Sequence, residues 1–117
     1  MAIKSTRLPG LIEVADPGDA GKIQTPAHHH SSTALVTGSG AETRTLSAPT
    51  FAGQRCSIAF QTDGGGDVVI TSDVHINHTG NTVATSNAAG HYLMLEGVRV
   101  GAALLWRTTS FEGFTFS

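Results

Sequence analysis

The stretch QRCSIAFQT, residues 54–62, decides the fold class, because apolar and polar side chains alternate along it. Cys56, Ile58 and Phe60 fall on one face, whereas the residues between them are polar or small. Alternation with a period of two predicts a half-buried β-strand. The glycine-rich run DGGGD, residues 63–67, follows, and then the apolar run VVIT, residues 68–71. This order predicts a hairpin with its loop at the glycines.

Short strand-like segments recur on both sides of this stretch, separated by turn residues about every 8–12 residues. The expected strands are residues 33–37, 43–47, 54–62, 68–71, 74–77, 82–85, 91–100, 103–108 and 111–116. No segment favours a helix of more than about two turns. The pattern predicts an all-β domain over residues 33–117, folded as a small antiparallel β-sandwich or a barrel-like sheet.

Residues 1–32 have a different character. They hold three of the four prolines and no aromatic residue, and their apolar residues occur in short bursts. The proline spacing excludes one continuous central strand. We therefore expect residues 1–32 to form an extended N-terminal arm that lies on a sister chain or a partner. The apolar residues available for that contact are Leu8, Leu11, Ile12, Val14 and Ile23.

The composition limits the classes of partner. Charged residues make up 14% of the chain, whereas globular proteins carry about 25%. The surface must therefore be rich in hydroxyl groups and glycine, since the chain has 15 Thr, 10 Ser and 14 Gly. A formal net charge of −2 argues against nucleic acid and against a polybasic membrane-surface protein. No apolar run approaches the roughly 20 residues of a membrane span, and no signal-peptide pattern opens the chain.

The supply of core residues favours self-association. Five Phe, one Tyr and one Trp must serve the whole β region, which is short for a domain that stands alone. Few Lys or Glu residues are present to protect the edges of the sheets. A cyclic homo-oligomer supplies the missing burial, and the closed oligomer or a partner surface covers the edge strands.

Two single residues have a structural and a functional interpretation. Cys56 is the only cysteine, so no disulfide forms within the chain, and its place in a strand predicts a small buried hydrophobe. Trp106 alternates with Leu104 and is therefore expected in the core. The alternative is an exposed ring on which a sugar stacks, with Tyr92 as a second contact.

The histidines do not form a metal-binding pattern. His28, His29 and His30 are consecutive, so in an extended segment they point to alternating sides. In a trimer, one histidine from each chain could meet on the axis, but a solvated or interface loop is the simpler interpretation. His75 and His78 fall on opposite faces of a strand, and His91 begins another strand. We expect no metal and no cofactor.

No catalytic motif is present. The chain lacks a Gly-x-Ser-x-Gly elbow between a strand and a helix. Asp63 and Asp67 flank a glycine turn and are best explained as turn formers, and the loop between them does not match a calcium-binding EF-hand. We expect a protein that is not an enzyme. A small hydrolase of the β-sandwich type would need a cluster of acids or histidines that the sequence does not reveal.

Four segments carry a resemblance to structural proteins of tailed bacteriophages. They are TLSAPTFAGQ at residues 45–54, TDGGGD at 62–67, GHYLML at 90–95 and LWR at 105–107. Their order is similar to a small β module of phage head-decoration (cement) proteins and virion fibres. The resemblance covers about residues 43–110 and leaves out the arm. It implies a trimeric β assembly that is bound to a capsid or to another part of the virion.

Two functions follow as expectations. The first is a capsid decoration protein on the outer surface of the virion, made in the host cytoplasm, whose trimer clamps neighbouring capsomers. Its partners are the major capsid protein and itself, and its arm grips the shell by adding a strand and by burying apolar residues. The alternative is a carbohydrate-binding or host-recognition module of a virion fibre that uses Tyr92, Trp106 or the glycine loop.

Overall fold

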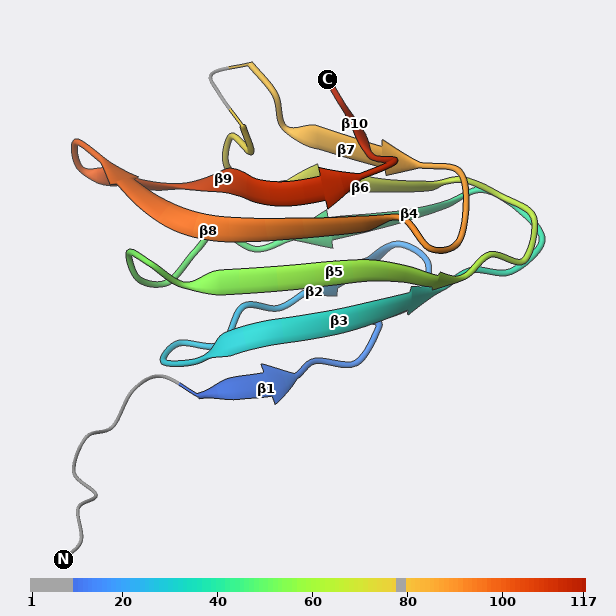
Figure 1. Cartoon of the computed structure of the whole chain (residues 1–117), viewed down its shortest axis with the longest axis horizontal. Coiled ribbons are helices and arrows are strands. Elements are labelled where there is room, and N and C mark those ends of the chain that lie inside the picture. The colour runs from blue at the N-terminus through green and yellow to red at the C-terminus, as the bar shows by residue number, and fades with distance from the viewer. Residues whose placement is uncertain (1–9, 78–79) are drawn as a thin grey trace, which may run out of the picture.

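The structure, a computed structural model, describes residues 10–77 and 80–117 and consists of two five-stranded β-sheets packed against each other (Figure 1). The strands are β1 (Leu11–Glu13), β2 (Gly21–Ile23), β3 (His30–Val36), β4 (Glu42–Leu46), β5 (Arg55–Thr62), β6 (Val68–Ser72), β7 (Val83–Ser86), β8 (Tyr92–Val100), β9 (Ala103–Glu112) and β10 (Thr115–Phe116). The first sheet has the order β1-β3-β5-β8-β9 and the second β10-β7-β6-β4-β2. The prediction of an all-β sandwich is confirmed.

The first six strands alternate between the two sheets. β1, β3 and β5 pair in parallel in the first sheet, and β2, β4 and β6 pair in parallel in the second. The chain thus winds through three successive coils, β1–β2, β3–β4 and β5–β6, each of which adds one strand to each sheet. The expectation of an antiparallel sandwich is wrong for this half, because alternation within a strand does not reveal which strand lies beside it.

The glycine run at residues 63–67 is a crossing between sheets, and the hairpin prediction is wrong. β5 and β6 belong to different sheets, so the run stacks on the preceding coil at residues 37–41. A Cβ on Gly64 would lie 2.5 Å from the carbonyl oxygen of Thr37, and one on Gly66 would overlap the Gly40 carbonyl. The glycines are needed because two backbones approach closely, which only a residue without a side chain permits.

The second half of the chain is antiparallel. β8 pairs with β5 and β9, and β7 pairs with β6 and β10. The strand expected at residues 74–77 is absent. This segment is a loop that buries Ile76 between the sheets and runs beside β9. The strand expected at residues 111–116 is broken at Gly113, which has a φ of 79°, and its end crosses to the second sheet as β10.

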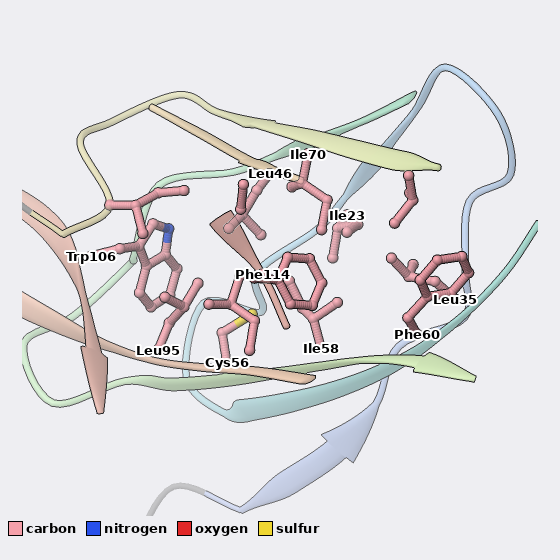
Figure 2. Packing of buried hydrophobic residues seen from close by; sticks show 14 residues of the cluster. Ile23, Leu35, Leu46, Cys56, Ile58, Phe60, Ile70, Leu95, Trp106 and Phe114 are labelled. Carbon is pink, nitrogen blue, oxygen red and sulfur yellow. The ribbon is translucent and has the colours of Figure 1, made fainter. Parts of the chain in front are cut away.

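The core lies between the two sheets (Figure 2). Cys56, Ile58 and Phe60 of β5 face inward as the alternation predicts. Figure 2 shows Trp106 at one end of the core and Phe60 beside Leu35 at the other. The buried hydrophobic residues are Ile23, Leu35, Leu46, Cys56, Ile58, Phe60, Val68, Ile70, Ile76, Ala84, Leu93, Leu95, Trp106 and Phe114.

The described part of residues 1–32 differs from the expected arm. Residues 10–32 contain β1 and β2, which pair with β3 and β4, and position 32 lies inside β3. Pro17 and Pro26 fall in the loops that follow β1 and β2, so neither proline interrupts the hydrogen bonds of a strand. Strands of three residues are too short to show a period in the sequence. The described residues therefore contain a first coil where an extended arm was expected.

Candidate functional site

The residues expected to grip a partner are separated by the fold. Leu11 and Ile12 lie on β1 with 68% and 40% of their surface exposed, and Val14 beside them is half-buried. Ile23 on β2 is fully buried in the core, so it cannot contact a partner in the folded state. Leu8 lies outside the described residues. The structure thus brings Leu11, Ile12 and Val14 together at one edge of the first sheet and excludes Ile23.

β1 presents an open backbone edge. The carbonyl of Gly10 accepts a hydrogen bond from His30 N at 2.8 Å, and Val14 N donates to the Ser32 carbonyl at 2.9 Å. Since backbone groups alternate in direction along a strand, those of Leu11 and Glu13 point away from β3. No strand among residues 10–77 and 80–117 pairs with this side. An extended segment of another chain can therefore add to the sheet here.

The opposite edge of the first sheet is covered. Trp106 N on β9 donates to the His75 carbonyl at 3.0 Å, and Thr108 Oγ1 donates to Asn77 Oδ1 at 3.0 Å. The loop that was expected to be a strand therefore occupies the outer side of β9. Further along, the ring of Phe111 packs edge-on against the ring of Phe116 with 4.9 Å between their centroids. These contacts close the sandwich on that side and protect β9 from added strands.

β2, the edge strand of the second sheet that lies on the same side of the molecule as β1, carries a charge that protects the edge. Lys22 on β2 forms an exposed ion pair with Asp73, with 2.6 Å between Nζ and Oδ2. An edge lysine is a common device against strand addition. Of the two edges on this side of the molecule, β1 is therefore the one suited to a partner strand.

A buried ion pair, which the sequence reasoning missed, ties the first coil to the second. Arg44 on β4 is fully buried, and its Nε and Nη2 atoms bind Asp16 Oδ1 and Oδ2 at 2.7 and 3.0 Å. Glu42 Oε1 lies 3.0 Å from Nη1. Asp16 Oδ2 also accepts from Val36 N at 2.9 Å. The signal was present, because alternation puts Arg44 on the same face as the buried Leu46.

The ion pair shifts the pKa values of both groups. Burial by itself raises the pKa of Asp16, but hydrogen bonds from Arg44, Val36 N and Gly18 N outweigh it and hold the pKa below its ordinary value of 3.8. The hydrogen bond to Asp16 raises the pKa of Arg44 above its ordinary value against the opposing effect of burial. Both groups are therefore charged at neutral pH, and the pair fixes residues 14–20 against β3 and β4.

Of the two aromatic residues considered for sugar contact, one is inaccessible. Trp106 is fully buried and donates from Nε1 to the Ser47 carbonyl at 3.0 Å, which confirms the core interpretation. Its ring cannot stack on a sugar. Tyr92 is half-buried, and its hydroxyl lies 3.1 Å from Ser110 Oγ.

The histidine run belongs to an anchored loop. The buried side chain of Gln54 donates from Nε2 to the carbonyls of Pro26 and His29 at 2.8 and 3.0 Å. His30 Nδ1 accepts from Arg55 N at 2.8 Å, whereas His28 and His29 are exposed. Within the described part of the chain, no three His, Cys, Asp or Glu side chains are grouped so as to hold a metal ion.

The other histidines that were considered as ligands have separate places in the fold. His75 Nδ1 accepts from Gly80 N at 2.9 Å, so this ring closes its own loop. His78 lies outside the described residues. His91 Nδ1 lies 2.8 Å from Ser86 Oγ in the turn between β7 and β8. Each described ring thus makes a local contact that explains its position.

The nucleophilic side chains near these groups are withdrawn from solvent. Ser86 is only 1% exposed, so its contact with His91 joins the two ends of a turn and does not open onto a substrate. Cys56 is 1% exposed, and burial raises the pKa of its thiol to about 11. Both side chains therefore serve packing.

Comparison with known proteins assigns no family. No family model matches the chain, and no curated protein matches it. Over residues 10–77 and 80–117, no helix has the length and apolar character needed to cross a membrane.

Proposed function

We propose that this chain is a phage capsid decoration protein. Acting as a homotrimer, it binds the major capsid protein on the outer surface of the virion and clamps neighbouring capsomers. The support is the all-β fold, the low content of charge, and the resemblance of residues 43–110 to phage decoration modules. The mechanism is mechanical and needs no cofactor.

The observation that carries the proposal is the open edge of β1. A decoration protein must hold a shell made of many identical subunits, and β1 offers each of them the same template for an added strand. The exposed side chains of Leu11 and Ile12 supply apolar contact beside the backbone hydrogen bonds. The grip is therefore the edge of the folded domain, in place of a free arm that runs to residue 32.

A trimer strengthens this grip. One short strand makes few hydrogen bonds, each with a net contribution of about 1 kcal/mol, so a single contact is weak. Three contacts on one rigid body act together, provided that the capsid sites match their spacing. The same geometry joins subunits of different capsomers, and this resists the outward pressure of packaged DNA.

A proline at position 11 tests the grip. Leu11 N points away from β3, so Leu11→Pro removes a hydrogen-bond donor from the open edge and leaves the pairing of β1 with β3 in place. The control is Leu11→Thr, which removes the apolar side chain and keeps the donor. Loss of one hydrogen bond weakens a single site by about fivefold and three linked sites by about a hundredfold.

The measurement is co-sedimentation with purified capsid shells that lack the protein, with thermal unfolding as the check that each variant is folded. We expect wild type and Leu11→Thr to bind and Leu11→Pro to be lost from the pellet. Equal binding of folded Leu11→Pro and wild type would refute strand addition at β1. If wild type itself stays in the supernatant, the decoration function is refuted.

A further inference from the structure

The charges of the domain are sorted between its two ends. Because β1, β3 and β5 run in parallel, they all start at one end, which we call the basic end, and finish at the other, the acidic end. The exposed arginines of the basic end are Arg55, Arg99 and Arg107, with Glu96 between two of them in the cross-strand register. The exposed Lys22–Asp73 ion pair lies at the same end and adds no net charge. The carboxylates of the acidic end are Asp16, Asp19, Glu42, Asp63, Asp67 and Glu112.

The basic end carries a protruding hairpin. β5 begins at Arg55, which pairs with Glu96 of β8, so the part of β8 and β9 beyond this point has no neighbour in β5. Figure 1 shows the β8–β9 hairpin extending past the start of β5. Arg99 and Val100 are exposed near its tip. A two-stranded ribbon is only marginally stable in water, so this tip gains from being packed against another surface.

The acidic end contains a depression that suits a guanidinium group. It has a volume of about 210 Å³ and is lined by Asp67, Thr85, Asn87, Gly113 and Thr115. A guanidinium group is planar, donates five hydrogen bonds and pairs best with a carboxylate. Among the lining residues, Asp67, Asn87, Thr85 and Thr115 have side-chain oxygens that can accept such hydrogen bonds. Arg44, the one arginine that the described residues place at this end, is buried in its own ion pairs and cannot neutralise the depression.

We propose that copies of this chain associate head to tail, with the Arg99 hairpin of one copy seated in the Asp67 depression of the next. Both complementary surfaces are present on one chain, so a second copy fits them without any other partner. A nucleic acid is disfavoured as the occupant, because the acidic end of the same molecule carries four carboxylates that do not pair with Arg44. This inference rests on the proposed function and adds to it the contact that joins the subunits of the homotrimer.

The contact joins different surfaces, so its geometry determines the assembly. A heterologous contact forms a ring when its rotation closes and a filament when it does not. A ring of three is the trimer of the proposed function. An end-to-end contact of this kind places the open edge of β1 outside the subunit interface, where it stays accessible to the capsid.

Charge reversal tests the contact in both directions. Arg99→Asp removes the basic partner and Asp67→Arg removes the acidic one, so we expect each variant alone to associate at least tenfold more weakly than wild type. The double variant Arg99→Asp/Asp67→Arg restores association, because Asp at position 99 of each copy then meets Arg at position 67 of the next, and a ring of three can close. Lys22→Asp is the control, since it changes the net charge as Arg99→Asp does but lies on β2, in neither the hairpin nor the depression.

Sedimentation velocity at low and high ionic strength gives the readout, and circular dichroism checks the fold. Closed trimers or filaments that weaken with salt support the contact. A wild type that stays monomeric, a reversal without effect, or a double variant that fails to recover would overturn it. Co-sedimentation with shells separates the two proposals: a monomer that still binds shells refutes only the head-to-tail contact, and a ring that does not bind them refutes the decoration function.

Discussion

Replacing Asp16 by asparagine is expected to destabilise the domain through Arg44. Asparagine keeps the size and one acceptor oxygen of the side chain but removes the negative charge. Arg44 then stays fully buried with its charge only partly compensated. The variant therefore tests whether the first coil is held by a buried charge pair or by packing alone.

The geometry sets the size of the effect. Removing one partner of a buried ion pair costs about 3–5 kcal/mol. Arg44 keeps a contact with Glu42 at 3.0 Å and a hydrogen bond to the Val36 carbonyl at 3.3 Å. We therefore expect the lower limit, a loss of about 3 kcal/mol in the free energy of unfolding, or about 12 °C in Tm at about 4 °C per kcal/mol.

Urea unfolding followed by circular dichroism measures the loss. Asp19→Asn is the matched control, because Asp19 lies in the same loop and is exposed, and its carboxylate accepts a single hydrogen bond from Thr43 N. We expect that control to lose less than about 1 kcal/mol. In Asp16→Asn/Arg44→Met no unpaired arginine remains, so the double variant is expected to lose less than the sum of its single variants.

The pH dependence gives a second, independent readout. The pKa of Asp16 in the folded protein lies below its ordinary value of 3.8, so its contribution is fully present above that value. It is lost as the pH falls through the lower pKa of the folded state. Asp16→Asn should therefore unfold with a shallower acid dependence than wild type. The role of the pair would be refuted if the free energy of unfolding of Asp16→Asn lies within about 0.5 kcal/mol of wild type and falls with pH as steeply as that of wild type.

Three further predictions concern the core and the coils. Gly66→Ala should lose about 1–3 kcal/mol because its Cβ overlaps the Gly40 carbonyl, whereas Gly40→Ala, where a Cβ meets nothing, should not destabilise; urea unfolding compares them. Trp106→Phe should lose about 1–3 kcal/mol in the same assay, because the Ser47 carbonyl loses its donor, and equal stability would contradict this role. The thiol of Cys56 should react with a thiol reagent at pH 8 only after unfolding, and rapid labelling of the folded protein would contradict its burial.

The β class of the fold could be predicted because long strands show their period. In β5 the inward positions of Cys56, Ile58 and Phe60 follow from alternation alone, and so does the burial of Trp106 in β9. The neighbours of a strand could not be predicted in this way. The glycines at residues 64–66 mark a change of direction, and both a hairpin and a crossing between sheets use such residues.

The candidate site was predictable only in part. Leu11 and Ile12 stand out as apolar residues in a segment without a core, and both are exposed. Ile23 looks the same in the sequence, yet it is buried because β2 joins the second sheet. Arg44 was missed because a charged residue is normally at the surface, and only its alternation with Leu46 indicated otherwise. Burial in these short strands depends on contacts with residues far away in the chain.

The winding of the first six strands has a consequence for the rate of folding. Each parallel pair joins residues roughly 20–25 positions apart, and β3 forms its two ladders only after the strands before and after it have arrived. Closing a loop of this length costs chain entropy, and the hydrogen bonds of the ladder compensate for that cost only after the loop has closed. Chains dominated by such long-range contacts fold in milliseconds to seconds. We therefore expect refolding at the slow end of the range for small domains. A newly made chain is exposed to aggregation until the coils have closed around their core.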